Sequence, residues 1–414
     1  MKKMRSKNYP WILVGLLWVV ALLNYMDRQM LSVMKPAMEM DISELRSATN
    51  FGYLMAIFLW IYGCMSPVSG VIADIFNRKW LIVYSLLVWS GVTFAMGYAT
   101  TFNQLYWLRA VMGISEALYI PAGLSLIADF HSSKTRSLAI GIHMTGFYVG
   151  SALGGFGATV AAAYSWQTTF HCFGMIGIVY SFVLILFLRG GKQPAETVST
   201  DKFPTSKKPP LFKGLALLLS NISFWIILFY FAVISVPGWA AKNWLPTLFA
   251  QNLNIPMSQA GPISTIAIAA SSFLGVIFGG ILSDRWVQKN IKGRVYTSAI
   301  GMSLTIPALL LLGFSHTLLG VVGAAVCFGL GYGIFDANNM PILCQFVSPR
   351  YRGTAYGLMN TAGVFAGALV TSLLGQSSDA GNLGKAFALL AGIVLITLFI
   401  QLYFLRPKEK DFEA

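Results

Sequence analysis

Long apolar stretches alternate with short polar ones along almost the whole chain. Twelve of these stretches are long enough to cross a bilayer, because a membrane-spanning helix needs about 20 apolar residues. We predict helices over residues 11–35, 48–73, 80–99, 104–128, 137–164, 168–188, 222–250, 260–283, 295–313, 318–345, 354–376 and 384–405. This pattern is typical of an all-α membrane protein with twelve transmembrane helices.

One polar stretch is much longer than the others. It lies between the sixth and seventh predicted helices and is rich in Lys and Pro, which is typical of a linker. We therefore predict an N-terminal six-helix bundle over residues 1–190, a cytoplasmic linker over 191–213 and a C-terminal six-helix bundle over 214–414.

Composition favours a membrane protein over a soluble one. Hydrophobic residues make up 56% of the 414 positions and charged residues only 11%, against about 45–50% and about 25% in soluble domains. The net charge of +14 comes from 29 Lys and Arg against 15 Asp and Glu, and most basic residues fall in the tails, the linker and the loops of one side. The positive-inside rule places that side in the cytoplasm. We expect a multi-pass protein of the cell (inner) membrane with both termini cytoplasmic, and no nucleic-acid partner.

Two short motifs occur twice, at nearly the same spacing. The stretch Gly70-Val-Ile-Ala-Asp74 follows the second predicted helix, and Gly280-Ile-Leu-Ser-Asp284-Arg285 follows the eighth. The stretch Arg136-Ser-Leu-Ala-Ile-Gly141 enters the fifth helix, and Arg352-Gly-Thr-Ala-Tyr-Gly357 enters the eleventh. Repeats of this kind are the sequence signature of duplicated transporter halves. We predict two pseudo-symmetric bundles related by an axis along the membrane normal.

The first of these motifs carries a resemblance to a known family. The stretch Gly70-Val-Ile-Ala-Asp74-Ile-Phe-Asn-Arg-Lys79 resembles the signature loop of the major facilitator superfamily, and the likeness extends over essentially the whole chain. The family usually has Arg at the position of Ile75 and Gly at that of Asn77, so the cytoplasmic latch formed by this loop is expected to be weaker here. The resemblance implies conformational gating at Gly70, Asp74, Arg78, Asp284 and Arg285.

Two further stretches indicate a branch of that superfamily. Asn24-Tyr25-Met26-Asp27-Arg28 in the first helix and Arg109-x-x-x-Gly113-x-x-Glu116-Ala117 in the fourth are similar to the anion:cation symporters, which carry organic anions. The spinster-like lipid transporters share much of both stretches. Pro121 favours the first branch, whereas Tyr119 and the Asn-Arg-Lys triplet at 77–79 favour the second.

Four ionisable residues lie inside predicted membrane helices: Asp27, Arg28, Arg109 and Glu116. Each costs about 2.5–3.5 kcal/mol on insertion scales, so it needs a partner and usually has a function. Arg109 and Glu116 are about two helical turns apart and therefore share a face. The alternative is a buried charge network that only fixes helix packing, although neutral small residues do that at a lower cost.

The charges suggest separate roles. Burial raises the pKa of a carboxyl group and a nearby guanidinium lowers it, so a moving Arg can release or take up a proton. We predict Asp27 and Glu116 as proton sites and Arg28, with its planar fork, as the main ligand of a carboxylate. The resemblance implies the same assignment, with Arg109 as partner of the carboxylates and Tyr25 as a hydroxyl donor.

The second half offers weaker candidates. The seventh helix contains Lys242, Asn243 and Trp244 between two prolines that could break the helix. This segment would line a sugar site or simply lie at the outer membrane interface. Polar residues of the tenth and eleventh helices (Asp336, Asn338, Asn339, Asn360 and Thr361) are either ligands or interhelical contacts. The candidate substrate-binding residues are Arg28, Tyr25, Tyr119, Lys242, Asn243, Trp244 and Asn360.

Other function classes lack their sequence signals. No phosphate-binding loop is present to drive a primary pump, and the four His and four Cys are scattered without the spacing of a metal site, a disulfide framework or an enzyme. We predict a monomeric, proton-coupled secondary transporter without a cofactor. It would import a small organic anion, a sugar acid such as a hexuronate, aldonate or sialic acid, by alternating access. The alternative is a spinster-like transporter of lysolipids or related amphiphiles.

Overall fold

The computed structural model describes residues 8–190, 218–220, 222–348 and 351–407. These residues contain twelve helical segments that are long and apolar enough to cross a membrane, so the prediction of an all-helical membrane fold is confirmed. The linker predicted over 191–213 lies outside the described residues. Large apolar side chains are exposed along the bundle, for example Leu319 at 87% and Leu186 at 77%, as expected for a protein whose solvent is lipid.

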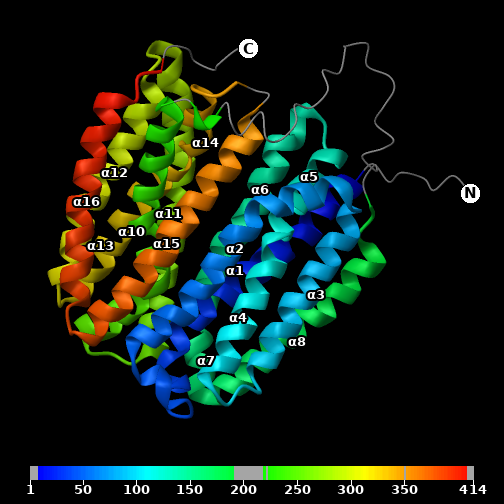
Figure 1. The fold of residues 1–414 in the computed structure, drawn as a ribbon, viewed down its shortest axis with the longest axis vertical. Helices are drawn as coiled ribbons and strands as arrows, with labels where there is room; N and C mark the ends of the chain where they lie inside the picture. Colours follow the sequence, from blue (N-terminus) through cyan, green and yellow to red (C-terminus); the bar gives the residue numbers. More distant parts are fainter. Residues whose placement is uncertain (1–7, 191–217, 221, 349–350, 408–414) are drawn as a thin grey trace, which may run out of the picture.

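The N-terminal half forms six spans from eight helices (Figure 1). They are α1 (Tyr9–Met38), α2 (Ala48–Ile75), α3 (Arg78–Met96), α4 (Phe102–Ala117) with α5 (Tyr119–Phe130), α6 (Ser133–Gly154) with α7 (Gly157–Ala163), and α8 (Trp166–Phe187). A short 3-10 helix, η1 (Ser43–Arg46), connects α1 to α2. Within this half α1 packs along α6, α3 along α8 and α2 along α4.

The C-terminal half repeats this plan. Its helices are α10 (Ile222–Leu253), α11 (Met257–Lys289), α12 (Gly293–Phe314), α13 (Leu318–Asp336) with α14 (Asn339–Cys344), α15 (Arg352–Asp379) and α16 (Leu383–Phe404). Here α11 and α12 pack against α13, α12 against α16, and α10 against α15.

The fourth span of each half is broken at an equivalent point. The first break is at Leu118, between α4 and α5, and the second is at residues 337–338, between α13 and α14. In each case a proline, Pro121 or Pro341, follows within four residues. Proline has no N–H to bond the carbonyl four residues earlier and its ring crowds that carbonyl. The matching breaks add a structural sign of duplication to the sequence repeats.

The seventh span is not broken at either of its two prolines. Helix α10 runs without interruption from Ile222 to Leu253, although it contains both Pro237 and Pro246. Prolines are tolerated inside membrane helices where neighbouring groups satisfy the freed carbonyls. The break that these prolines could cause does not occur, and the residues between them lie on a regular helix.

The two halves meet along two helix pairs, α2 with α15 and α6 with α11. Some of their contacts lie at the end of the molecule away from the start of α1 and the end of α16 (Figure 1). There Asp379 accepts hydrogen bonds from the backbone N–H groups of Ala48 and Thr49, at 2.7 and 2.8 Å. Nearby, the Thr159 hydroxyl donates to the Ser258 carbonyl at 2.7 Å. Direct contacts between the halves thus close the far end in this structure.

Candidate functional site

Arg28 and Glu116 form an ion pair at the centre of the N-terminal half. Arg28 Nε donates to Glu116 Oε2 at 2.5 Å, and Asn24 Nδ2, one turn earlier on α1, donates to the same oxygen at 2.9 Å. Glu116 is completely buried on α4. Its second oxygen and the Arg28 Nη2 have no hydrogen-bond partner among the described residues. Each member of the pair therefore has a polar atom that makes no hydrogen bond to the described residues.

Aromatic rings surround the Arg28 guanidinium. Its Cζ lies 5.2 Å from the ring centroid of Tyr25, 4.8 Å from that of Phe58 and 4.8 Å from that of Tyr62. A cation over an aromatic face is stabilised by about 0.5–2 kcal/mol, more where water is excluded. The rings hold the guanidinium in place while 12% of the side chain stays exposed. A fixed, partly accessible guanidinium is a suitable receptor for a carboxylate.

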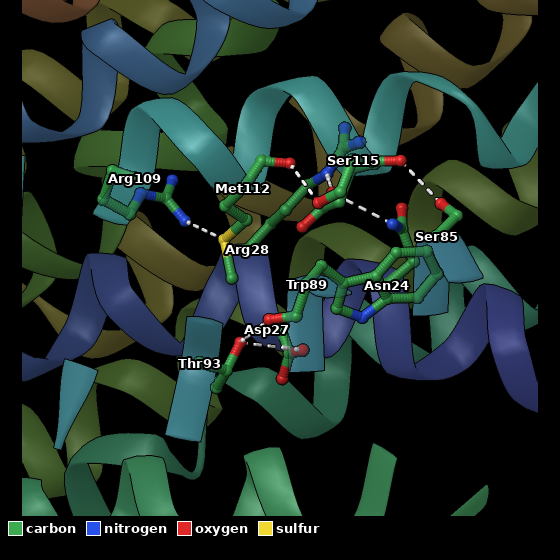
Figure 2. A network of polar contacts seen from close by, with 10 residues as sticks. Asn24, Asp27, Arg28, Ser85, Trp89, Thr93, Arg109, Met112 and Ser115 are labelled. Carbon is green, nitrogen blue, oxygen red and sulfur yellow. Dashed lines mark hydrogen bonds and ion pairs between the residues drawn. The ribbon is translucent and has the colours of Figure 1, made fainter. Parts of the chain in front are cut away.

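Asp27 does not share the partner of Arg28. Consecutive residues of an α-helix point about 100° apart, and Asp27 faces α3, where the Thr93 hydroxyl donates to its Oδ2 at 3.4 Å (Figure 2). The side chain is buried, and Oδ1 has no hydrogen-bond partner among the described residues. Asp27 interacts electrostatically with Glu116 and Arg109. It is therefore a second buried carboxylate beside the ion pair.

Arg109 is a buried cation without a direct carboxylate partner in the described part of the chain. Its Nη1 donates to the Met112 sulfur at 3.0 Å (Figure 2). Its Cζ lies 4.6 Å from the centroid of Phe58. Thioether sulfur is a weak acceptor, so this contact satisfies the guanidinium poorly. Glu116 and Asp27 act on it only from a distance. Sequence reasoning named all four charged groups but did not show that only one direct ion pair links them.

Phe58 and Tyr62 were not among the residues singled out from the sequence. They lie one turn apart on α2 with stacked rings 5.8 Å between centroids. Phe58 contacts both guanidinium groups of the site, and Tyr62 contacts Arg28. An aromatic residue in an apolar membrane helix has no sequence signal that separates a site position from ordinary packing, so only the structure assigns them here.

Three of the predicted substrate-binding residues make internal contacts. Tyr119 is fully buried and its hydroxyl donates to the Leu17 carbonyl at 2.8 Å. Trp244 is also fully buried, and its Nε1 donates to the Thr371 carbonyl at 3.0 Å. Asn243 donates to the Thr371 hydroxyl at 2.8 Å. In this arrangement these polar groups join helices of one half, so we leave them out of the proposed site.

Lys242 lies against Tyr25, the ring that also contacts Arg28. Its Nζ is 5.6 Å from the Tyr25 ring centroid and 4.7 Å from that of Trp239, and the side chain is half-buried. Gln29 of α1 donates to the Lys242 backbone carbonyl at 2.9 Å, which connects the two halves at this depth. Lys242 therefore stands next to the N-terminal charge cluster rather than at an outer interface.

Asn360 lies where α15 crosses α2. Its amide donates to the Ser66 hydroxyl at 3.3 Å, and the neighbouring Thr361 hydroxyl donates to the Gly63 carbonyl at 3.4 Å. Both contacts join the two halves. In this state Asn360 is an interhelical contact, one of the two alternatives open from the sequence.

Comparison with known proteins defines the family. Residues 17–371 match the profile of the Major Facilitator Superfamily. The chain belongs to this superfamily. The resemblance stated from the signature loop is thereby confirmed, as is the twelve-helix fold.

The superfamily relatives include transporters of sugar acids. The "Probable galactarate/D-glucarate transporter" of Escherichia coli strain K12 is 25% identical over 402 residues, which cover 90% of this chain and 89% of the relative. The hexuronate transporter of Bacillus subtilis strain 168 is 24% identical over 414 residues, covering 94% and 93%. The chloroplastic ascorbate transporter of Arabidopsis thaliana is 25% identical over 421 residues, covering 97% and 76%.

A solved superfamily structure shows the same fold. A bacterial homologue of the human lysosomal transporter Spinster, in an inward-facing and unoccupied conformation, superposes with a TM-score of 0.83. The two chains are 19% identical over 98% of this chain and 99% of the other. At that identity the likeness shows the fold alone.

The superfamily signature loop joins α2 to α3 and makes contacts within its own half. Asn77 caps α3, its Oδ1 accepting from the Lys79 N–H at 3.1 Å. Arg78 forms an ion pair with Asp129 at the end of α5, and Lys79 Nζ donates to the Ile185 carbonyl at 2.8 Å. These contacts tie α3 to the ends of α5 and α8.

The other residues predicted to gate transport have fewer contacts. Nothing lies within 4 Å of the place a Cβ would take at Gly70, and the Asp74 side chain lies outside the described part of the structure. Asp284 and Arg285 are both exposed, and no bond from either to another described residue is present. The predicted weaker latch stays a prediction.

Proposed function

We propose that the chain is a secondary transporter that carries a sugar-derived carboxylate by alternating access, with protons as the coupling ion. The observation that carries this proposal is Arg28. Its guanidinium is fixed by three rings, partly exposed, and bonded to Glu116 through Nε only. The names of the superfamily relatives, which refer to galactarate, glucarate, hexuronate and ascorbate, support a substrate of this class.

Charge balance supports coupling to protons. The cluster contains two guanidiniums, Arg28 and Arg109, and two carboxylates, Asp27 and Glu116, so its formal charge is zero when all four are ionised. An entering carboxylate adds a negative charge at a buried site, which is costly unless it is compensated. One proton on either carboxylate restores neutrality. Binding of one monoanion together with one proton is therefore the least costly stoichiometry.

Glu116 is the better placed of the two proton acceptors. It shares the guanidinium of Arg28 with the incoming substrate, whereas Asp27 bonds to Thr93. A substrate carboxylate that takes over Arg28 would leave Glu116 as a buried and unpaired charge, which protonation removes. Competition for one guanidinium thus links the binding of the anion to the binding of the proton.

Replacement of Arg28 by alanine is expected to abolish substrate binding. Loss of one member of a buried charge pair costs about 2–5 kcal/mol, which corresponds to at least about 30-fold in affinity. The measurement is thermal stabilisation of the purified protein, confirmed by calorimetry, with D-glucuronate, D-gluconate and N-acetylneuraminate. D-glucose and a lysophosphatidylcholine serve as comparison ligands.

Arg46→Ala is the matched control, because it removes an exposed guanidinium from η1. Stabilisation by a sugar acid that is retained in Arg46→Ala and lost in Arg28→Ala supports the proposal. Stabilisation by the lysolipid alone, unaffected by either substitution, would select a lipid carrier instead.

A further inference from the structure

An ionisable residue of the C-terminal half stands apart from the charge cluster described so far. Asp336 is the last residue of α13, immediately before the break that precedes Pro341. It is exposed although it belongs to a membrane-spanning segment. Its Oδ1 accepts a hydrogen bond from Asn339 Nδ2 at 3.0 Å. An accessible carboxylate within a membrane span faces the interior of the bundle rather than lipid.

The surroundings of Asp336 come from both halves of the molecule. Lys242 of α10, Tyr332 of α13, Tyr356 of α15 and Tyr148 of α6 lie within electrostatic range of Asp336. Tyr332, one turn before Asp336, packs against Gly238, which is one turn before Lys242 on α10. Tyr148 also contacts Phe273 of α11, with ring centroids 5.9 Å apart, where the halves meet. Asp336 therefore faces the interface between the two halves.

Several hydroxyl groups in this region are free to bind a ligand. Within the described residues, the hydroxyls of Tyr148, Tyr332 and Tyr356 make no hydrogen bond to another side chain or to the backbone. A phenolic hydroxyl both donates and accepts. Three such hydroxyls near the Asp336 carboxylate are able to form hydrogen bonds with the hydroxyls of a polyol.

Lys242 links this region to Arg28. The Arg28 guanidinium and the Lys242 ammonium lie on one ring, at 5.2 and 5.6 Å from the Tyr25 centroid. Counted at about 1.5 Å per residue, both cations lie roughly 15 Å from the far ends of their helices, α1 and α10. Two cations at one depth and against one ring would be able to bind the two carboxylates of a dicarboxylate. Asp336 opposes the binding of a second carboxylate, because its negative charge offsets the positive charge of Lys242.

We propose that Asp336 is a specificity-determining residue that compensates Lys242, so that this end of the site accepts hydroxyl groups and rejects a second carboxylate. The inference rests on the proposed function and names its substrate class: open-chain or cyclic sugar monocarboxylates, with the carboxylate at Arg28. The chain then differs in selectivity from its Escherichia coli relative, whose name refers to the dicarboxylates galactarate and glucarate.

The test compares D-gluconate with D-glucarate, which differ only in the group at the sixth carbon. The purified full-length protein in detergent is titrated with each by calorimetry. We expect the wild type to favour gluconate, and Asp336→Asn to raise the affinity for glucarate on the order of tenfold with little change for gluconate. A tenfold change in affinity is the expected effect of removing one nearby charge in a partly solvated site. Adding Lys242→Met to Asp336→Asn is expected to remove the gain.

Glu44→Gln is the control, since it removes one negative charge from the exposed surface of η1. It is expected to leave the ratio of the two affinities unchanged. A wild type that binds glucarate as tightly as gluconate, or an Asp336→Asn variant that binds both with the wild-type ratio, overturns this inference while the proposed function stands. A wild type that binds neither acid, while a lysolipid stabilises it, overturns the proposed function itself.

Discussion

Two guanidinium groups, that of Arg109 buried and that of Arg28 partly exposed, share one aromatic ring, and this arrangement defines the site at the residue scale. Phe58 lies 4.8 Å from the Cζ of Arg28 and 4.6 Å from that of Arg109. Like charges held this close repel each other. The negative faces of the ring and the carboxylate of Glu116 offset that repulsion. The ring therefore fixes the orientation of the Arg28 guanidinium without competing for its N–H groups.

Phe58→Leu is expected to weaken sugar-acid binding by about three- to tenfold, because each cation–π contact contributes about 0.5–1 kcal/mol or more. Calorimetric titration measures the affinity and thermal unfolding measures the stability. Phe170→Leu is the matched control, as Phe170 is fully buried on α8 and away from both guanidiniums. Equal losses of affinity in the two variants would mean that Phe58 acts through packing alone.

Much of the charge cluster follows from the sequence, but its pairing does not. Ionisable residues in apolar helices stand out in the amino-acid sequence, because inserting a charged side chain into the bilayer is costly. The separation of Asp27 from Arg28 also follows from the helical rotation of about 100° per residue. The contacts of Phe58 and Tyr62, and the internal bonds of Tyr119 and Trp244, depend on how distant helices pack. No local pattern encodes that packing.

At the scale of the elements, proline acts differently in different helices. Pro121 and Pro341 follow breaks at equivalent places in the two halves, whereas α10 continues through Pro237 and Pro246. The twelve spans and the internal repeat were predictable because length and hydropathy decide which segments enter a bilayer. Whether a proline breaks a span is decided by the groups that neighbouring helices offer to the freed carbonyl, which a single sequence does not show.

One contact between elements holds the far end closed. The Asp379 carboxylate, at the end of α15, accepts from the N–H groups of Ala48 and Thr49 and from the Ser47 hydroxyl at the start of α2. It therefore caps a helix of the other half and faces the positive end of that helix's dipole. Opening of the far end during transport requires these bonds to break.

Asp379→Ala is expected to favour the state open at the far end. Loss of a capping carboxylate costs about 1 kcal/mol, which shifts a two-state equilibrium about fivefold. The measurement is the labelling rate of a single cysteine placed at Gly52 of α2, which contacts α15, after the four native cysteines are replaced. Asp41→Ala, which removes a carboxylate bonded within one half to Trp166 and Gln167, is the control. Faster labelling in the control than in Asp379→Ala would contradict the role of this cap.

At the scale of the whole molecule, the charged groups of the proposed site are divided between the two halves. Arg28 and Glu116 belong to the N-terminal half, and Lys242 and Asp336 to the C-terminal half. The contacts at the far end hold the two bundles together there, and the region that contains these four residues lies between the bundles. Rocking of two rigid halves about a central site is the general mechanism of alternating access in duplicated transporters. A ligand that contacts both halves stabilises the states in which they approach each other.

The central claim is that the substrate carboxylate and Glu116 compete for the Arg28 guanidinium, so that binding of the substrate is coupled to protonation of Glu116. The most direct measurement compares two activities of Glu116→Gln in proteoliposomes: exchange of labelled substrate, and uphill accumulation driven by an inward proton gradient. Glutamine keeps the shape of the side chain but cannot take up the coupled proton. We predict that exchange persists while gradient-driven accumulation falls to the level set by simple equilibration. Accumulation at the wild-type level in Glu116→Gln would contradict the account and remove Glu116 from the coupling mechanism.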